Sequence, residues 1–334
     1  MLWFFLIIST LGWGIAEIFY KKGNLEREKY SHLKTTVFVG IFFGIYATGE
    51  LIYVLATGNE FNPFNFILYL PVAACYIGSM MLSYFGVRFI EESISDPIEN
   101  TSGAMAALLS AIFLHESLNA LSITAVVVTV IGILGVGFAE NNGKTDRKKI
   151  LGKKLAIIAF AMPFFYAILD SVGTFLDIFY TDDVASTLLV NVNEDSLEHV
   201  ANICYEYIFF LVSIGILIFL RCKKVKLFSL ANSNQEQVIN EASTQEVQGT
   251  KLKWYQNLYL QRNKILAALF ETIGQSTYLF ALSEGVGIAA VIIGAGTVII
   301  SLILSRIILK EKLSVLQYIF VFIILLGIIL LSLA

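Results

Sequence analysis

Acidic side chains lie inside largely apolar stretches of this sequence. Glu17, Glu50, Asp170 and Glu206 each have predominantly apolar neighbours. An ionisable group near the centre of a membrane is unfavourable by on the order of 3 kcal/mol, so function is its default interpretation. A carboxylate there can bind a substrate amine or another cation, or it can carry a proton. The alternative for Glu17, four residues before Lys21, is an interfacial position without a function.

These acids form two pairs when the two halves of the chain are compared with each other. Aligning the first apolar run of each half places Glu17 opposite Asp170. Aligning the second runs places Glu50 opposite Glu206. Equivalent positions in an inverted repeat lie symmetrically about an axis in the membrane plane, where transporters bind their substrates. We therefore predict that Glu17, Glu50 and Asp170 take part in binding.

A short polar run supplies further candidates. In Ser95–Asn100, the order Asp96, Pro97 and Glu99 is typical of a helix N-terminus, with Asp as the cap and Glu in a capping box. Pure capping is one interpretation of this run. The other is that the helix start reaches a substrate cavity, which Glu99 and Asn100 then line.

A polar stripe marks the apolar run at residues 263–283. Glu271, Gln275 and Tyr278 recur at helical spacing and share one face. Such a stripe in a membrane helix normally faces protein or water, so we predict that all three line the cavity. The small residues between Gly287 and Gly296 instead indicate close helix packing.

Other chemistries lack their residues in this sequence. The three cysteines and three histidines show no metal-ligand or redox spacing, and no phosphate-binding loop is present. We therefore expect no metal, no cofactor and no enzymatic activity. The basic clusters follow the membrane topology, so we expect no nucleic-acid partner.

The composition predicts that these candidates are carried by an all-α integral membrane protein. Residues of hydrophobic type make up 57% of the 334, and the mean hydropathy is +0.76. A span needs about 20 apolar residues, and long continuous runs in lipid must be helices. The ten apolar runs that we distinguish cover residues 2–20, 35–56, 65–89, 97–115, 120–139, 155–180, 200–220, 263–283, 287–308 and 315–333.

Positive charge sets the predicted orientation. All 23 lysines and arginines fall in or beside the odd-numbered loops between these runs, and the even-numbered loops carry none. Lysine and arginine stay cytoplasmic. The protein is therefore predicted to lie in the cell membrane as a multi-pass protein, with its N-terminus and C-terminus both extracytoplasmic.

An internal repeat divides the chain. At a constant offset of 195 residues the matches include Leu109/Leu304, Ser110/Ser305, Glu116/Glu311 and Gly132/Gly327. Each copy holds five spans, so the second must enter the membrane inverted. We predict a first repeat at residues 1–140, a cytoplasmic linker at 141–154, and a second repeat at 155–334 that contains a disordered cytoplasmic loop at 221–262.

These features resemble the drug/metabolite transporter superfamily, and most of all its EamA-like transporters. The residues that carry the resemblance are Leu114–Leu118 with Gly132, Leu309–Leu313 with Gly327, and Gly12-Trp13-Gly14. The resemblance implies ten helices around a central cavity and transport by alternating access. Two departures are Phe165-Tyr166-Ala167 in place of Gly12-Trp13-Gly14, and an apolar 290–295 where the first half has its polar run.

The predicted function is secondary active transport of a small polar organic metabolite. An amino acid or a related compound is one candidate, and the resemblance slightly favours export. The expected partners are the substrate, a proton or other coupling ion, and membrane lipid, and a homodimer is compatible with the sequence. The alternatives are a non-transporting membrane subunit or sensor, a passive channel, and a membrane-embedded lipid-modifying enzyme.

Overall fold

The computed structural model describes residues 1–26, 28–114, 119–141, 153–181, 188–228, 254–311 and 314–332. The regular structure in these ranges is helical, which confirms the predicted all-α class. Its elements are α1 (Leu2–Gly23), α2 (Ser31–Ala56), α3 (Asn65–Leu68), α4 (Leu70–Gly86), α5 (Glu92–Glu99), α6 (Ser102–Phe113), α7 (Ala120–Asn141), α9 (Lys153–Thr181), η2 (Glu194–Ser196), α10 (Leu197–Cys222), α12 (Trp254–Leu260), α13 (Arg262–Leu304), η3 (Ser305–Leu309) and α14 (Val315–Ser332).

Many of these helices have the length and composition of membrane spans. Six helical segments are long and apolar enough to cross a bilayer, namely Leu2–Gly23, Ser31–Ala56, Ile157–Thr181, Leu197–Cys222, Arg262–Glu284 and Ile288–Leu309. Leu70–Gly86, Ala120–Gly135 and Val315–Gly327 are shorter apolar helices. Large apolar side chains such as Ile45 and Phe322 are each 67% exposed, as is favourable for a surface that contacts lipid.

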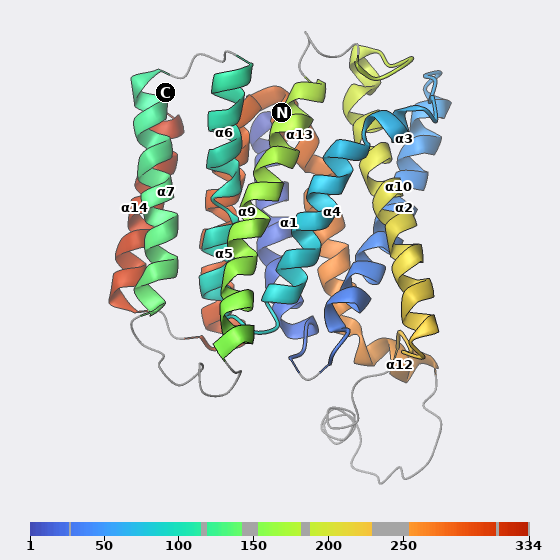
Figure 1. Cartoon of the computed structure of the whole chain (residues 1–334). Coiled ribbons are helices and arrows are strands. Elements are labelled where there is room, and N and C mark those ends of the chain that lie inside the picture. The colour runs from blue at the N-terminus through green and yellow to red at the C-terminus, as the bar shows by residue number, and fades with distance from the viewer. Residues whose placement is uncertain are drawn as a thin grey trace, which may run out of the picture.

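The helices stand side by side in one bundle, with α7 and α14 at one edge and α2 and α10 at the other (Figure 1). Close pairs are α2 with α10, α4 with α9, and α7 with α14, while α1 packs along α13. The described chain begins and α14 ends on the same face of the bundle, opposite α12 (Figure 1).

Helix α13 folds back on itself around α1. A Cβ atom built on Gly12 would lie 2.6 Å from the backbone N of Gly274, and one built on Gly14 would lie 2.6 Å from Ile300. Neighbouring turns of α1 therefore touch both parts of α13, so these parts run in opposite directions. The separate spans predicted at 263–283 and 287–308 correspond to the apolar segments Arg262–Glu284 and Ile288–Leu309, and helical structure continues between them.

The predicted helix start at Asp96 is wrong. Helix α5 begins at Glu92, and Pro97 lies inside it. Proline lacks the N–H that would bond to the carbonyl four residues earlier, and α5 ends two residues later. Helix α6 then begins at Ser102, so a break separates two short helices where we predicted one span at 97–115. Asp96 accepts hydrogen bonds from Asn100 Nδ2 (2.6 Å) and Ser301 Oγ instead of capping α5.

The contact between α7 and α14 is reciprocal. A Cβ atom on Gly132 would lie 2.7 Å from Ile324, and one on Gly327 would lie 2.2 Å from Thr129. These four positions are related by the repeat offset of 195, since 132 + 195 = 327 and 129 + 195 = 324. The glycine of each repeat thus packs against the other repeat at equivalent positions, which are 324 in the second repeat and 129 in the first.

Some predicted features lie outside the described residues. They are most of the linker predicted at 141–154, most of the loop predicted at 221–262, and the repeat-turn residues Glu116, Leu118 and Leu313.

We expect Gly12→Ala to destabilise the protein by about 1–3 kcal/mol, the range of overpacked sites. The added methyl would meet backbone atoms of Gly274 and Phe270 at 2.6–3.0 Å, and backbone cannot rotate away as a side chain can. Thermal unfolding of the purified protein in detergent measures the effect. Gly49→Ala in α2 is the matched control, because no atom lies within 4 Å of its added methyl. Equal unfolding temperatures for the two variants would contradict the prediction.

Candidate functional site

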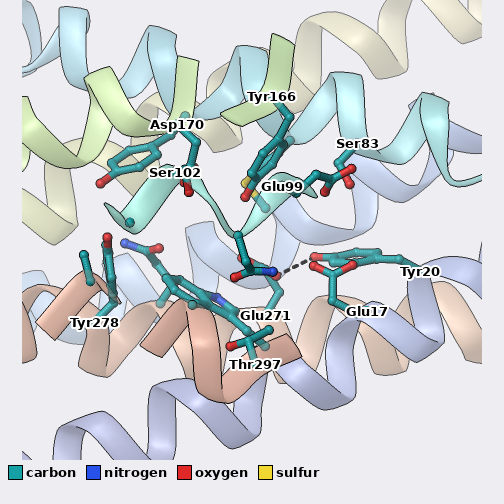
Figure 2. A pocket seen from close by; sticks show the side chains of 18 of the residues that line it. Glu17, Tyr20, Ser83, Glu99, Ser102, Tyr166, Asp170, Glu271, Tyr278 and Thr297 are labelled. Carbon is teal, nitrogen blue, oxygen red and sulfur yellow. Dashed lines mark hydrogen bonds between the residues drawn. The ribbon is translucent and has the colours of Figure 1, made fainter. Parts of the chain in front are cut away.

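A pocket lies at the centre of the bundle, between helices from both halves of the chain (Figure 2). The space between its walls, counted out to its opening, is about 740 Å³. Its lining residues are Trp13, Glu17, Tyr20, Tyr76, Met80, Ser83, Tyr84, Glu99, Asn100, Ser102, Gly103, Tyr166, Asp170, Tyr205, Glu271, Gln275, Tyr278, Ala290, Gly294 and Thr297.

Seven of the eight candidates from the sequence line this pocket, namely Glu17, Glu99, Asn100, Asp170, Glu271, Gln275 and Tyr278. The eighth, Glu50, lies elsewhere. Its carboxyl group is beside His199 and Glu206, between α2 and α10. The structure thus brings the predicted pair Glu17 and Asp170 to one site and the pair Glu50 and Glu206 to another.

The pocket acids come from four helices, and hydroxyl groups donate hydrogen bonds to three of them. Asp170 on α9 accepts hydrogen bonds from Ser102 Oγ (2.7 Å) and Ser79 Oγ (3.4 Å). Glu99, the last residue of α5, accepts one from Ser95 Oγ at 2.7 Å. Side chains held in this way lose little further freedom when they contact a ligand.

A chain of two tyrosines orients the carboxyl group of Glu271 on α13. Tyr20 donates a hydrogen bond to Glu271 Oε2 at 2.8 Å (Figure 2), and Tyr84 donates one to Tyr20 Oη at 2.9 Å. Gly294 leaves room for the break between α5 and α6, since a Cβ there would lie 3.1 Å from the Asn100 carbonyl oxygen.

The charge of the pocket is strongly one-sided. Its lining contains four carboxyl groups, and none of its lining residues is a lysine, an arginine or a histidine. Beside it, the carboxylate oxygens of Glu17, Glu92 and Asp96 lie within 4.8 Å of one another. The pocket therefore favours a ligand that brings positive charge.

Aromatic rings supply much of the remaining wall. The rings of Trp13 and Tyr278 are 4.6 Å apart between centroids, and those of Tyr20 and Tyr84 are 4.5 Å apart. The faces of such rings attract cations. Thr297 Oγ1 is buried without a hydrogen-bond partner, so it is free to bond to a ligand.

The sequence reasoning missed several of these groups. It did not single out Tyr20, Tyr76 or Tyr205, because an aromatic side chain in a membrane helix can equally face lipid. It also missed Asp177, which is not in the lining but accepts hydrogen bonds from the lining residue Tyr76 (2.7 Å) and from Tyr69. Asp177 follows Asp170 by seven residues on α9, so helical spacing was an available signal that both share a face.

An ionic cluster joins helix ends and loops at the α12 end of the bundle. Glu28 lies between two buried ammonium groups, 2.5 Å from Lys34 Nζ and 3.2 Å from Lys264 Nζ. Burial raises the pKa of the Glu28 carboxyl, but the attraction of Lys264 and Lys34 and their hydrogen bonds outweigh burial, so the pKa is below its usual value. Arg88 donates to the carbonyl oxygens of Leu25, Glu26 and Glu28, which ties the loop after α4 to the loop after α1.

Comparison with known proteins agrees with this architecture. A solved crystal structure of a protein 13% identical to this chain superposes with a TM-score of 0.51, over 97% of this chain and 98% of the other. At that identity the likeness concerns the fold alone. No protein of curated function matches the chain. A family model described as the EamA-like transporter family matches residues 1–138 and 242–333, which is most of the sequence. This multi-pass membrane protein therefore belongs to the EamA-like transporter family.

Proposed function

We propose that this protein is a secondary transporter of small organic amines that works by alternating access of two inverted five-helix halves. The observation that carries the proposal is the pocket itself. It is lined by four carboxyl groups and several aromatic rings, without a basic residue in the lining. An ammonium group can bond to carboxylates while its methylene groups and charge contact the aromatic faces.

The substrate class is narrower than the polar metabolite that the sequence predicts. An amino acid also carries a carboxylate, which would be repelled by the acids of the pocket. Gln275 is the amide donor in the lining that could bind it, since Asn100 Nδ2 already donates to Asp96. An amine without a carboxylate needs no such compensation, so we place decarboxylated amines ahead of amino acids.

Helix pairing supports the ten-span inverted repeat. In an inverted repeat α1 corresponds to α9, and the two parts of α13 correspond to α4 and α6. Helix α1 contacts α13, and α9 contacts α4 and α6, as this correspondence requires. The same exchange maps the pairs α2–α10 and α7–α14 onto themselves. The reciprocal contact of Gly132 and Gly327 is a further instance of this symmetry. Substrate binding between inverted halves is the arrangement that alternating access uses.

Each end of the bundle has contacts that would open in turn. At one end the Glu28 cluster joins the loop after α1 to α13. At the other end, Asn65 exchanges two hydrogen bonds with the backbone of Val190, at 2.8 and 3.0 Å. In the proposed cycle one set breaks while the other holds, which admits the substrate from one side at a time. In this proposal the Glu28 end faces the cytoplasm and both termini lie outside the cell, in keeping with the positive-inside pattern of the lysines and arginines.

Ligand-induced stabilisation tests the substrate class directly. The purified protein is heated with tyramine, tyrosine, cadaverine, lysine, glutamate or glucose. We expect stabilisation by tyramine and cadaverine, by about 2.7 kcal/mol at one hundred times the dissociation constant. Tyrosine and lysine differ from tyramine and cadaverine only by the carboxylate, so each matched pair isolates its effect.

The strongest amine is then tested for counterflow, in which unlabelled amine inside proteoliposomes drives uptake of labelled amine. Saturable counterflow supports a carrier and excludes a channel. Stabilisation by glutamate but not by the amines would contradict the substrate class. Amine binding without counterflow would favour a sensor.

A further inference from the structure

A second group of buried polar side chains lies between α2 and α10. His199, Asn202 and Glu206 follow one another at helical spacing on α10, and Glu50 faces them from α2. His199 Nδ1 is 2.7 Å from Glu50 Oε1, and Asn202 lies beside the same carboxyl group. None of these residues lines the central pocket. We call this group the α2–α10 cluster.

The carboxyl group of Glu206 is buried without a partner. Glu206 is 0% exposed and neither of its carboxylate oxygens accepts a hydrogen bond. Asn202, one helical turn earlier, is 1% exposed, and its amide group interacts with the Glu50 carboxyl group. Leaving a buried polar atom unbonded costs about 1–3 kcal/mol, and more for a charged group, so the unpartnered Glu206 carboxyl group requires an explanation.

The charges of the groups around Glu206 favour the binding of a cation there. The titratable groups that face it are Glu50 and Tyr46 from α2 and Tyr205 from its own helix, and His199 is bonded to Glu50. Glu206 and Glu50 are within electrostatic reach of each other. With His199 as the one basic group among these, two ionised carboxylates would leave a net negative charge in the membrane interior.

A proton fits this place better than a metal ion. A metal ion needs about three ligands, and the group of three such residues found close together among the described residues is Glu17, Glu92 and Asp96, outside the α2–α10 cluster. A proton needs no such cage. A proton on Glu206 would turn its carboxyl group into a donor, for which Asn202 Oδ1, one helical turn away on α10, is an unbonded acceptor.

We propose that Glu206, Glu50 and His199 form a proton-binding site separate from the amine pocket. Release transfers one proton from the Glu206 carboxyl by way of Glu50 and the His199 imidazole to water, leaving a Glu206 carboxylate. His199 is the water-accessible member, with 23% of its side chain exposed.

The location explains how this proton would drive transport, a role that rests on the proposed function. Helix α2 belongs to the first half and α10 to the second. Loss of the proton leaves two carboxylates facing each other across their contact, and like charges in a poorly hydrated interior repel strongly. Protonation therefore holds the halves together at this contact and deprotonation loosens it.

Infrared difference spectroscopy tests the site without any substrate. Membranes with the reconstituted protein are titrated between about pH 5 and pH 8, where a histidine-linked carboxyl group can change charge. We expect a C=O stretching band of a protonated carboxyl group that disappears as the pH rises. Glu206→Gln should remove this band, Glu206→Asp should restore it at a shifted frequency, and the exposed Glu60→Gln should leave it unchanged. A band that persists in Glu206→Gln would overturn the proposal.

Amine counterflow at equal pH on both sides tests the coupling. The wild-type rate should change by up to about tenfold per pH unit as a single group titrates. The rate of Glu206→Gln should be independent of pH, and Glu60→Gln should behave as wild type. A Glu206→Gln variant that keeps the wild-type pH profile overturns the coupling role. The absence of any wild-type counterflow, together with a Glu206-dependent band, counts against the proposed transport function and supports the proton site.

Discussion

Asp170→Asn is expected to weaken amine binding and exchange about 10- to 100-fold while leaving the protein folded. A hydrogen bond to a charged group contributes about 1.5–3 kcal/mol, and each 1.4 kcal/mol is a factor of ten in affinity. Asparagine has nearly the shape of aspartate and can still accept from Ser102 and Ser79 through its oxygen. What it lacks is the negative charge that an ammonium group would contact.

Tyramine titration of the purified variant and counterflow in proteoliposomes measure this loss. Asp195→Asn is the control, because it makes the same chemical change at an exposed residue that does not line the pocket. Equal affinity and rate for Asp170→Asn and wild type would remove Asp170 from the binding site. An unfolding temperature close to that of wild type shows that a loss arises in the pocket and not from misfolding.

Glu28→Gln is expected to lower the free energy of unfolding by about 3–5 kcal/mol, the usual effect of removing one partner of a buried ion pair. Lys34 and Lys264 are each 2% exposed, so neutral glutamine would leave two ammonium groups facing each other away from water. Glu26→Gln, at an exposed position in the same loop, is the control and should unfold like wild type.

The same carboxylate predicts a pH dependence of stability. The pKa of Glu28 is lower in the folded protein than its ordinary value, so its contribution is fully present above the ordinary value. The contribution is lost as the pH falls through the lowered folded-state pKa. Thermal unfolding measured from about pH 7 down to pH 3 should therefore show a steeper loss for wild type than for Glu28→Gln. Parallel curves would mean that Glu28 is not held as a carboxylate between the two lysines.

Local periodicity was sufficient to find most of the candidate site. The helical spacing of Glu271, Gln275 and Tyr278 depends only on the regular turn of a helix, and all three line the pocket. Which face of a helix meets the pocket depends on its neighbours, which periodicity does not report. Glu50 has the same sequence signature as Glu17, yet α2 packs on α10 and carries Glu50 to a different site.

Local sequence patterns also gave a wrong helix boundary. The order Asp96, Pro97, Glu99 satisfies the pattern of a helix start, but α5 begins earlier and these residues lie at its end. The break that follows this run presents Asn100 and Ser102 to the pocket.

The packing of α1 between the two parts of α13 has a consequence for biogenesis. Ser9 on α1 donates a hydrogen bond to the carbonyl of Gly274, and Tyr20 donates to Glu271. Residues 24–261 must be synthesised before these partners exist. Until then the polar face of α1, including Glu17, has no permanent partner from α13 in the bilayer. The high sequence separation of this contact makes its formation a late step. Helix α1 is thus synthesised long before the helix against which it packs most closely.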